Sequence, residues 1–483
     1  MSFFERSALD LAALVRNREV GPVELLESHI DRIERVNPAL NAVVEKRYDQ
    51  AREEARAAEE AVAKKRKLGP LHGVPCTVKE FLAVEGLRQT GGLVIRRDFV
   101  SQRDSTVVDR LKAAGAIVMG TTNAPEGGLW HETHNRVYGR TANPHDLYRT
   151  SGGSSGGEGA IVASGASPFG IGSDVGGSIR IPSAFCGIYG HKPTHGIVPN
   201  TGHFPSAPPE PYMAVGPMAR SAHDLMPLLR VLSGPDGHDP HARPWKLGDP
   251  ETVDLSGLTV YPMPTNGEAS VSPAVQAAVM DAATALQNRG ASIRELDVPK
   301  LRHAFKIWAT LMSSLGIEYD ELVTDGGIVP LRTEFRRWAQ GRSRHTGAVL
   351  AMIALERAMH RLPDQTERMR RLAAELQSEL EVALGDNGVM LHPPFSRVAP
   401  HHRTIGIGNP TDAGVTAVFN ILQFPVTVAP VGVSDGVPTA VQIIGRRGND
   451  HLTIAAGMAL EDALGGWVPV EPRRGPRPRL RLA

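Results

Sequence analysis

Short apolar segments alternate with helical segments along much of the chain, and this alternation restricts the possible folds more than any other feature. The strand-like segments are 74–78, 116–119, 258–261 and 292–296, and the helical ones are 105–114 and 273–287. Gly115 and Gly290 end the two helices, because glycine readily adopts the backbone conformation that closes a helix. Such alternation predicts an α/β fold in which a largely parallel or mixed sheet is covered by helices.

The 483 residues are predicted to form one large domain over residues 1–470. The sequence has no composition break long enough to be a linker and no internal repeat that would indicate a solenoid. Glycine and proline concentrate in a core at about 70–240, whereas the segment at about 301–385 is almost wholly helical and is interpreted as an insertion over the sheet. The Arg- and Pro-rich end, 471–483, is predicted to be a disordered basic tail.

The composition excludes several classes of function. Lys and Arg number 53 against 52 Asp and Glu, so the basic excess typical of nucleic-acid-binding proteins is missing. No stretch approaches the about 20 apolar residues of a membrane span, and the N-terminus lacks the apolar core of a signal peptide. Cys76 and Cys186 are too few for a disulfide framework, and His392, His401 and His402 lack the helical spacing of a metal motif. These features predict a cytoplasmic protein without a nucleic-acid partner, a membrane span or a metal.

Two runs rich in glycine and serine, 151–160 and 170–182, lie in the core. This composition is also typical of flexible linkers, but the first run leads directly into the apolar, helix-compatible segment 160–163. A phosphate-binding loop is disfavoured because no Lys-Ser or Lys-Thr pair follows the glycines. A dinucleotide motif is disfavoured because Gly170 and Gly172 lack a third glycine at the required spacing. The glycines therefore need another explanation.

Glycines beside a serine allow successive backbone N–H groups to converge on one oxygen atom. The residues that can supply such an oxyanion hole are Val175, Gly176, Gly177 and Ser178. A serine nucleophile also needs a neighbouring base, for which histidine is the usual choice. The histidines near the core are His131, His134, His191, His195 and His203, and none sits in a diagnostic GxSxG setting. The sequence pattern therefore does not exclude a Ser-His-Asp triad.

Lys79, at the end of an apolar strand, is the alternative base. Burial there would lower the pKa of its ammonium group toward neutrality, so that it could accept a proton through a bridging serine. The neighbouring Glu80 would oppose this shift unless its carboxylate points away. These arguments do not choose between Ser154 and Ser155 as the bridging serine.

Three long segments, 73–80, 153–160 and 172–194, closely resemble the amidase signature family. Shorter matches lie at 120–123, 143–144, 216–220 and 441–445, so that the resemblance spans most of residues 5–465 and is weakest in the helical region. It implies a single α/β domain with a large mixed sheet covered by helices on both faces. It also implies a Ser-cisSer-Lys triad that cleaves carboxylic amides through an acyl-enzyme, without a metal or organic cofactor.

Matched motif by motif, the resemblance implies that Ser178 is the nucleophile, Ser154 the bridging serine and Lys79 the base. The backbone of 175–178 would form the oxyanion hole. The implied supporting residues are Ser155, Asp174 and Arg180, and the implied acyl-pocket residues are Gly127, Gly128, Leu129 and Trp130, although core packing explains Trp130 equally well. The chain departs from the family's usual residues at Glu80, Ser173, His191 and Ala440, none of which removes a catalytic atom.

The motifs at 157–160 and 216–220 lean toward the fatty acid amide hydrolase branch of the family. We therefore expect a free-standing hydrolase that acts on a small-molecule amide. Esters and carbamates are further candidate substrates, and a homodimer is the candidate assembly. The alternatives are the A subunit of a glutamine-dependent tRNA amidotransferase and a non-catalytic protein that binds ligands with its glycine loops. For Phe335, Trp338 and Met352, core packing is favoured over an apolar channel or a membrane surface.

Overall fold

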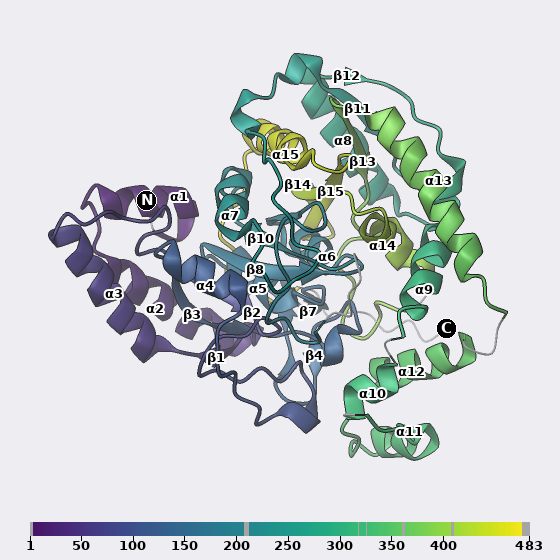
Figure 1. Ribbon diagram of the computed structural model, residues 1–483, viewed down its shortest axis with the longest axis horizontal. Coiled ribbons are helices and arrows are strands. Elements are labelled where there is room, and N and C mark those ends of the chain that lie inside the picture. Colours follow the sequence, from purple (N-terminus) through teal and green to yellow (C-terminus); the bar gives the residue numbers. More distant parts are fainter. Residues whose placement is uncertain are drawn as a thin grey trace.

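An 11-stranded mixed sheet crosses the molecule in the computed structural model (Figure 1). Its strand order is β1-β3-β2-β8-β10-β9-β14-β15-β13-β11-β12. The strands are β1 (Val43–Lys46), β2 (Pro75–Lys79), β3 (Ile117–Thr122), β8 (Phe169–Asp174), β9 (Tyr189–Lys192), β10 (Ala214–Ala219), β11 (Thr259–Pro262), β12 (Ser292–Ile293), β13 (Gly388–His392), β14 (Val426–Ser434) and β15 (Val437–Ile444). Two small sheets pair β4 (His134–Asn135) with β5 (Gly139–Arg140) and β6 (Ala142–Asn143) with β7 (Asp146–Thr150). The structure describes residues 3–206, 212–316, 318–324, 326–359, 363–406 and 410–475.

Parallel pairing of β2 with β8 determines where the chemistry-bearing residues lie. Val78 of β2 is opposite Ile171 of β8 in this pairing. Because parallel strands end at the same edge of a sheet, Lys79 at the end of β2 comes beside Ser173 and Asp174 at the end of β8. Two segments that are far apart in the sequence therefore deliver their polar ends to one place.

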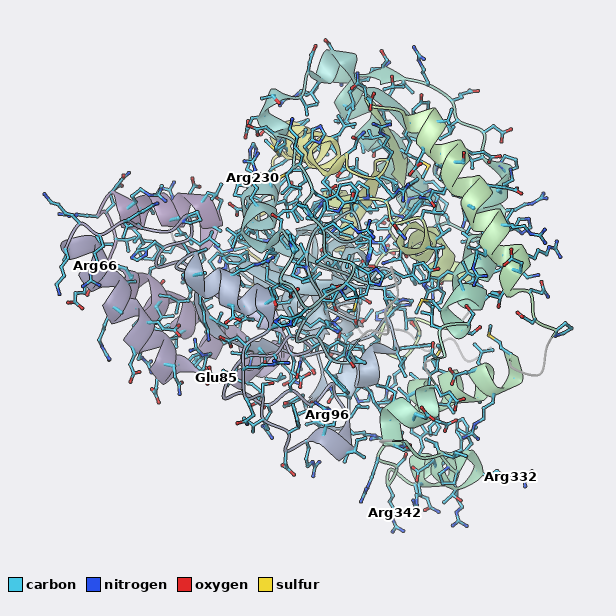
Figure 2. All side chains as sticks on the ribbon, viewed as in Figure 1. Arg66, Glu85, Arg96, Arg230, Arg332 and Arg342 are labelled. Carbon is cyan, nitrogen blue, oxygen red and sulfur yellow. The ribbon has the colours of Figure 1, made fainter. Side chains whose placement is uncertain are left out.

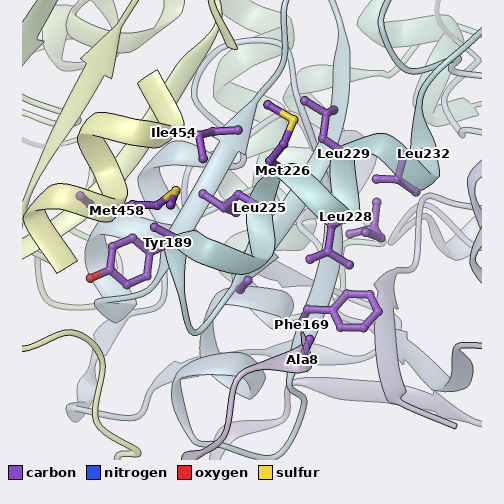
Figure 3. Close-up of a cluster of buried hydrophobic side chains, with 14 of the residues drawn as sticks. Ala8, Phe169, Tyr189, Leu225, Met226, Leu228, Leu229, Leu232, Ile454 and Met458 are labelled. Atoms are coloured by element: carbon purple, nitrogen blue, oxygen red, sulfur yellow. The ribbon is translucent and has the colours of Figure 1, made fainter. Parts of the chain in front are cut away.

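The sheet separates two cores, because successive side chains of a strand point to opposite faces. In β13, Val389 and Leu391 face one core and Met390 faces the other. The first core is covered by α1 (Ala8–Arg16), α4 (Thr106–Ala113), α7 (Leu225–Leu232), α8 (Pro273–Asn288) and α15 (Asp450–Leu464). Figure 3 shows part of it, with Leu225, Met226, Leu228 and Leu229 of α7 beside Ile454 and Met458 of α15. The predicted helices at 105–114 and 273–287 are α4 and α8 of this layer.

Helices also cover the opposite face, as the fold prediction requires. The helices on this face are α2 (Pro22–Leu40), α3 (Tyr48–Ala63), α5 (Gly156–Ala163), α6 (Arg180–Cys186), α9 (Ala304–Ser313), α13 (Thr366–Leu384) and α14 (Gly414–Ile421). Every residue of α5 is buried, which explains why 160–163 is apolar throughout. The predicted α/β fold, with a mixed sheet between two helical layers, is confirmed.

The segment at about 301–385 is helical, as predicted. It contains α9 (Ala304–Ser313), α10 (Tyr319–Thr324), α11 (Leu331–Ala339), α12 (Gly347–Met359) and α13 (Thr366–Leu384), at the right and lower right of Figure 1. Two of its arginines, Arg332 and Arg342, are labelled in Figure 2 and point away from the body into solvent. Within the described ranges, no helix combines the length and the apolar character that crossing a bilayer requires.

The C-terminal tail begins with a segment that contacts the body. The backbone N–H of Leu147 donates to the carbonyl of Arg473 at 2.9 Å, and Glu471 forms an ion pair with the buried Arg32. The backbone and charges at 471–473 thus find partners that the sequence does not reveal, and the disorder of the tail stays a prediction. Residues 476–483 lie outside the described part of the chain.

Candidate active site

Lys79 is fully buried at the end of β2, and its side chain meets two serines. Its Nζ lies 2.6 Å from Ser154 Oγ and 3.0 Å from Ser173 Oγ. Burial lowers the pKa of Lys79 to about 7, against the opposing effect of the carboxyl groups of Asp174, Glu158 and Glu80. A large fraction of this lysine is therefore neutral near neutral pH, as the sequence argument required.

The Glu80 carboxyl group points away from the lysine. It accepts hydrogen bonds from the backbone N–H groups of Thr90 and Gly91. Burial raises the pKa of Glu80 to about 8, although these hydrogen bonds act in the opposite direction. Burial likewise raises the pKa of Glu158 to about 8. Since burial favours the neutral form of both carboxyl groups, it weakens their opposition to the lowered pKa of Lys79.

The two Gly/Ser runs face one another. The N–H of Ser155 donates to the carbonyl of Ser178 at 3.1 Å, which joins the loop before α5 to the loop before α6. The Gly153–Ser154 peptide bond is cis. Ser154 and Ser178 line the same cavity, whereas the Ser155 hydroxyl donates to the carbonyl of Ser173 at 3.3 Å. The structure thus brings Ser154, and not Ser155, to the lysine.

Asp174 holds the loop that carries Ser178. Its carboxylate accepts from the N–H groups of Gly177 at 2.8 Å and Ile179 at 3.0 Å, and from the Arg180 guanidinium at 2.8 Å. Burial by itself would raise the pKa of Asp174, but the Arg180 charge and these hydrogen bonds hold it well below its ordinary value. Both partners of this ion pair are buried, so the loop is fixed by a charge network without solvent contact.

The same network bears on the expected oxyanion hole of 175–178, which stays a prediction. The N–H of Gly177 is already committed to Asp174, and Gly177 does not line the cavity. Val175, Gly176 and Ser178 do line it. The sequence does not reveal that the Gly177 N–H is already paired, because this depends on how the loop closes around Asp174.

Trp308 of α9 is a residue that sequence reasoning missed. Its indole Nε1 donates to the carbonyl of Val175 at 3.0 Å, and its ring packs so closely on Gly176 that an added Cβ there would lie 3.0 Å from Cζ2. No signal in the sequence could have found this contact, because it joins the helical segment to a loop more than a hundred residues earlier.

The cavity above the serines has a volume of about 1080 Å³. All four residues expected at the acyl pocket, Gly127, Gly128, Leu129 and Trp130, line it. Gly128 has a φ of +76°, and a Cβ there would lie 3.0 Å from the Phe81 ring, so a side chain would be strained and crowded. Helices α9 and α12, with Leu315 just after α9, add an apolar wall that also includes Met312, Met352, Leu355 and Met359. Trp130 and Met352 thus face the cavity.

Phe335 and Trp338 do not contribute to this wall. Both are on α11 and stay 38% and 46% exposed. Core packing was the favoured explanation for Phe335, Trp338 and Met352, and it is wrong for all three, because α11 turns the first two toward solvent and α12 turns the third toward the cavity.

Two of the histidines considered as bases, His131 and His203, line the cavity. His203 contacts the lysine network through Ser173, with Nε2 at 2.8 Å from Ser173 Oγ. His191 is instead paired with Asp450 at 3.0 Å, behind the cavity lining. In the described part of the chain, no three His, Cys, Asp or Glu side chains gather as a metal ion would require.

Comparison with known proteins identifies the family. Residues 24–454 match the family model described as Amidase. The chain is 40% identical to fatty-acid amide hydrolase 2-A of Danio rerio, over 95% of this chain and 89% of the relative, and 37% identical to fatty-acid amide hydrolase 2 of Homo sapiens, over 96% and 90%.

Solved structures agree with this result. A bacterial aryl acylamidase of the amidase signature family superimposes with a TM-score of 0.81 at 28% identity, over 96% of this chain and 97% of that one. These matches support the fatty acid amide hydrolase side of the family and do not favour the amidotransferase subunit or a non-catalytic protein. The chain belongs to the amidase signature family of hydrolases.

Proposed function

We propose that this chain is a free-standing amide hydrolase that forms an acyl-enzyme on Ser178, within one amidase domain over residues 1–470. One observation carries the proposal: a buried lysine with a pKa near 7 lies 2.6 Å from Ser154, beside a cavity that also exposes Ser178. A neutral amine at this place is a base that needs no histidine or metal to accept a proton.

Acylation starts with neutral Lys79. It takes the proton of the Ser154 hydroxyl as Ser154 takes the proton of Ser178, and the Ser178 oxygen attacks the amide carbonyl. The carbonyl oxygen becomes an oxyanion that the N–H groups lining the cavity stabilise. When the C–N bond breaks, the same relay returns the proton to the leaving nitrogen, which departs as a neutral amine.

Deacylation runs through the same groups. A water molecule gives a proton to the relay and attacks the acyl carbonyl, after which the proton returns to Ser178 and the carboxylic acid leaves. Esters and carbamates can acylate Ser178 by the same route, since only the leaving group differs.

The proposed substrates have long apolar acyl groups. The wall formed by α9 and α12 is rich in methionine and leucine, side chains that adapt to flexible apolar chains. The relatives named fatty-acid amide hydrolase 2 support this assignment. Cys76 and Cys186 are both free and buried, which supports the proposed place in the reducing cytoplasm.

The purified chain alone tests the proposal with a ladder of acyl p-nitroanilides, from acetyl to long-chain and aryl groups. We expect turnover with an optimum at long acyl chains, loss of turnover in Ser178→Ala, and unchanged turnover in the exposed control Ser256→Ala. Silence across the ladder, together with no labelling of Ser178 by a fluorophosphonate, would refute the proposal. Turnover that appears only when partner subunits are added would restore the amidotransferase alternative. Size-exclusion chromatography of the same sample decides between a monomer and a homodimer.

A further inference from the structure

A continuous chain of hydrogen bonds leads from Lys79 to a backbone carbonyl. Lys79 Nζ lies 3.0 Å from Ser173 Oγ, and Ser173 Oγ lies 2.8 Å from His203 Nε2. The other ring nitrogen, Nδ1, lies 2.9 Å from the carbonyl oxygen of Pro205. His203 is buried against the Phe81 ring, which meets the imidazole edge to face at 5.7 Å.

Each bond in this chain has only one possible direction when the histidine is neutral. The carbonyl of Pro205 can only accept, so Nδ1 of His203 carries the proton and Nε2 is the acceptor. The Ser173 hydroxyl therefore donates its single proton to His203, and its oxygen accepts an N–H from Lys79. Burial lowers the pKa of His203 to about 3, and the nearby Lys79 charge acts in the same direction, so the imidazole stays neutral.

The direction of these bonds matters because a neutral amine has only one lone pair. Lys79 has two oxygen neighbours, Ser154 and Ser173, and only the first leads to the nucleophile in the proposed mechanism. If Ser173 donated its proton to the amine, the lone pair would be occupied and Ser154 could not pass its proton on. An acceptor behind Ser173 prevents this competition.

We propose that His203 is a positioning residue that keeps the Ser173 hydroxyl turned away from the Lys79 lone pair, and so directs that lone pair to Ser154. The inference rests on the proposed function, because it assigns Lys79 as the base. It adds a residue that acts on the lysine through Ser173.

Few charged groups surround the hydrogen-bonded series from Lys79 to Pro205. The carboxyl groups that act on Lys79 are Asp174, Glu158 and Glu80, of which the first is paired with Arg180 and the other two have raised pKa values. Lys79 is the charged group that acts on His203. We therefore expect His203 variants to affect Ser178 by changing the hydrogen bonding of Lys79.

A double-mutant cycle tests the inference, with the rate of Ser178 labelling by a fluorophosphonate as the readout. This reagent measures the nucleophilicity of Ser178 without knowledge of the natural substrate. We expect His203→Leu to lower the labelling rate about 10-fold at the alkaline plateau, because the freed hydroxyl can then occupy the lone pair. In a Ser173→Ala background no hydroxyl competes, so His203→Leu should have little further effect.

Two further variants separate positioning from packing. His203→Gln places an amide oxygen where Nε2 was, and it should restore most of the labelling rate. His223→Leu, a substitution of a half-exposed histidine paired with Asp462, should leave the rate unchanged. Thermal unfolding of every variant identifies any loss of folded protein, and rates are compared per folded molecule.

The outcomes are distinct. An equal fall in rate for His203→Leu in both backgrounds, or no recovery in His203→Gln, would show that the imidazole only fills space, and would overturn the inference. Wild-type protein that is not labelled at Ser178 would overturn the proposed function itself, and this inference with it. A fall that disappears in the Ser173→Ala background and is reversed by glutamine supports the positioning role.

Discussion

The indole Nε1 of Trp308 donates a hydrogen bond of 3.0 Å to the carbonyl oxygen of Val175. That carbonyl belongs to the same peptide unit as the N–H of Gly176. In a planar trans peptide the two groups point in opposite directions, so fixing the carbonyl also fixes the N–H. A helix of the 301–385 segment thus aims one of the expected oxyanion donors.

Trp308→Phe removes this hydrogen bond and keeps most of the packing on Gly176. We expect kcat to fall about 10-fold, less than the 10²–10³ typical of losing an oxyanion donor outright, because the donor remains but loses its fixed direction. KM should change little, since the oxyanion exists only beyond the ground state. Steady-state kinetics on the preferred p-nitroanilide measure both constants. Trp245→Phe, outside the cavity lining, is the matched control, and an equal fall in both variants would contradict the assignment.

The pH dependence of kcat/KM should report the protonation of Lys79. Below a pH of about 7 the lysine is protonated and cannot accept a proton, so kcat/KM should rise with pH and level off above that value. A pH profile on an uncharged substrate measures this limb.

Lys192 provides the control for that profile. It is a second buried lysine whose pKa burial lowers to about 7, but it donates to the carbonyl of Pro193 and does not line the cavity. We expect Lys192→Met to keep the midpoint of the limb, and Lys79→Met to abolish turnover. If the midpoint of the pH profile moves in Lys192→Met, the titrating group is Lys192 and not Lys79, and the prediction is wrong.

Asp174→Asn should destabilise the protein strongly. It leaves the Arg180 guanidinium buried without its partner, and such losses cost roughly 3–5 kcal/mol of unfolding free energy. Activity should fall as well, because the carboxylate also holds the N–H of Gly177 in the catalytic loop. Urea unfolding measures the first effect. Asp462→Asn, in an exposed pair with Arg289, should change stability by only about 0–1 kcal/mol, and similar values for the two variants would contradict the argument.

Met352→Trp should shorten the preferred acyl chain. Met352 is on α12 in the apolar wall of the cavity, and a larger ring there removes volume that a long chain would occupy. We expect kcat/KM to fall for the longest p-nitroanilides and to stay unchanged for acetyl. Met280→Trp on the exposed side of α8 is the control. A uniform loss along the ladder would indicate general damage to the site.

Much of the site was predictable because its signals are local. An apolar strand that ends in Lys79 indicates a buried lysine, and the run around Ser154 and Ser178 indicates loops in which backbone groups approach closely. The resemblance to a known family then distinguished Ser154 from Ser155, and the 2.6 Å contact with Lys79 agrees with that choice.

Other contacts depend on the whole fold. Whether Glu80 faces the lysine, and whether the N–H of Gly177 is free, depends on how loops close around Asp174 and Thr90. The pattern of the 301–385 segment predicts helices, but it does not say which side chain reaches the cavity.

Apolar periodicity and glycine content act over a few residues, so the sequence alone predicts many of the helices and strands, the buried lysine and the two glycine–serine loops. The folded chain is needed to see that Trp308 holds the expected oxyanion loop, that His203 contacts the lysine network and that Met352 faces the cavity. Each of these contacts joins segments distant in the chain, and their geometry follows from the packing of the sheet and its helical layers.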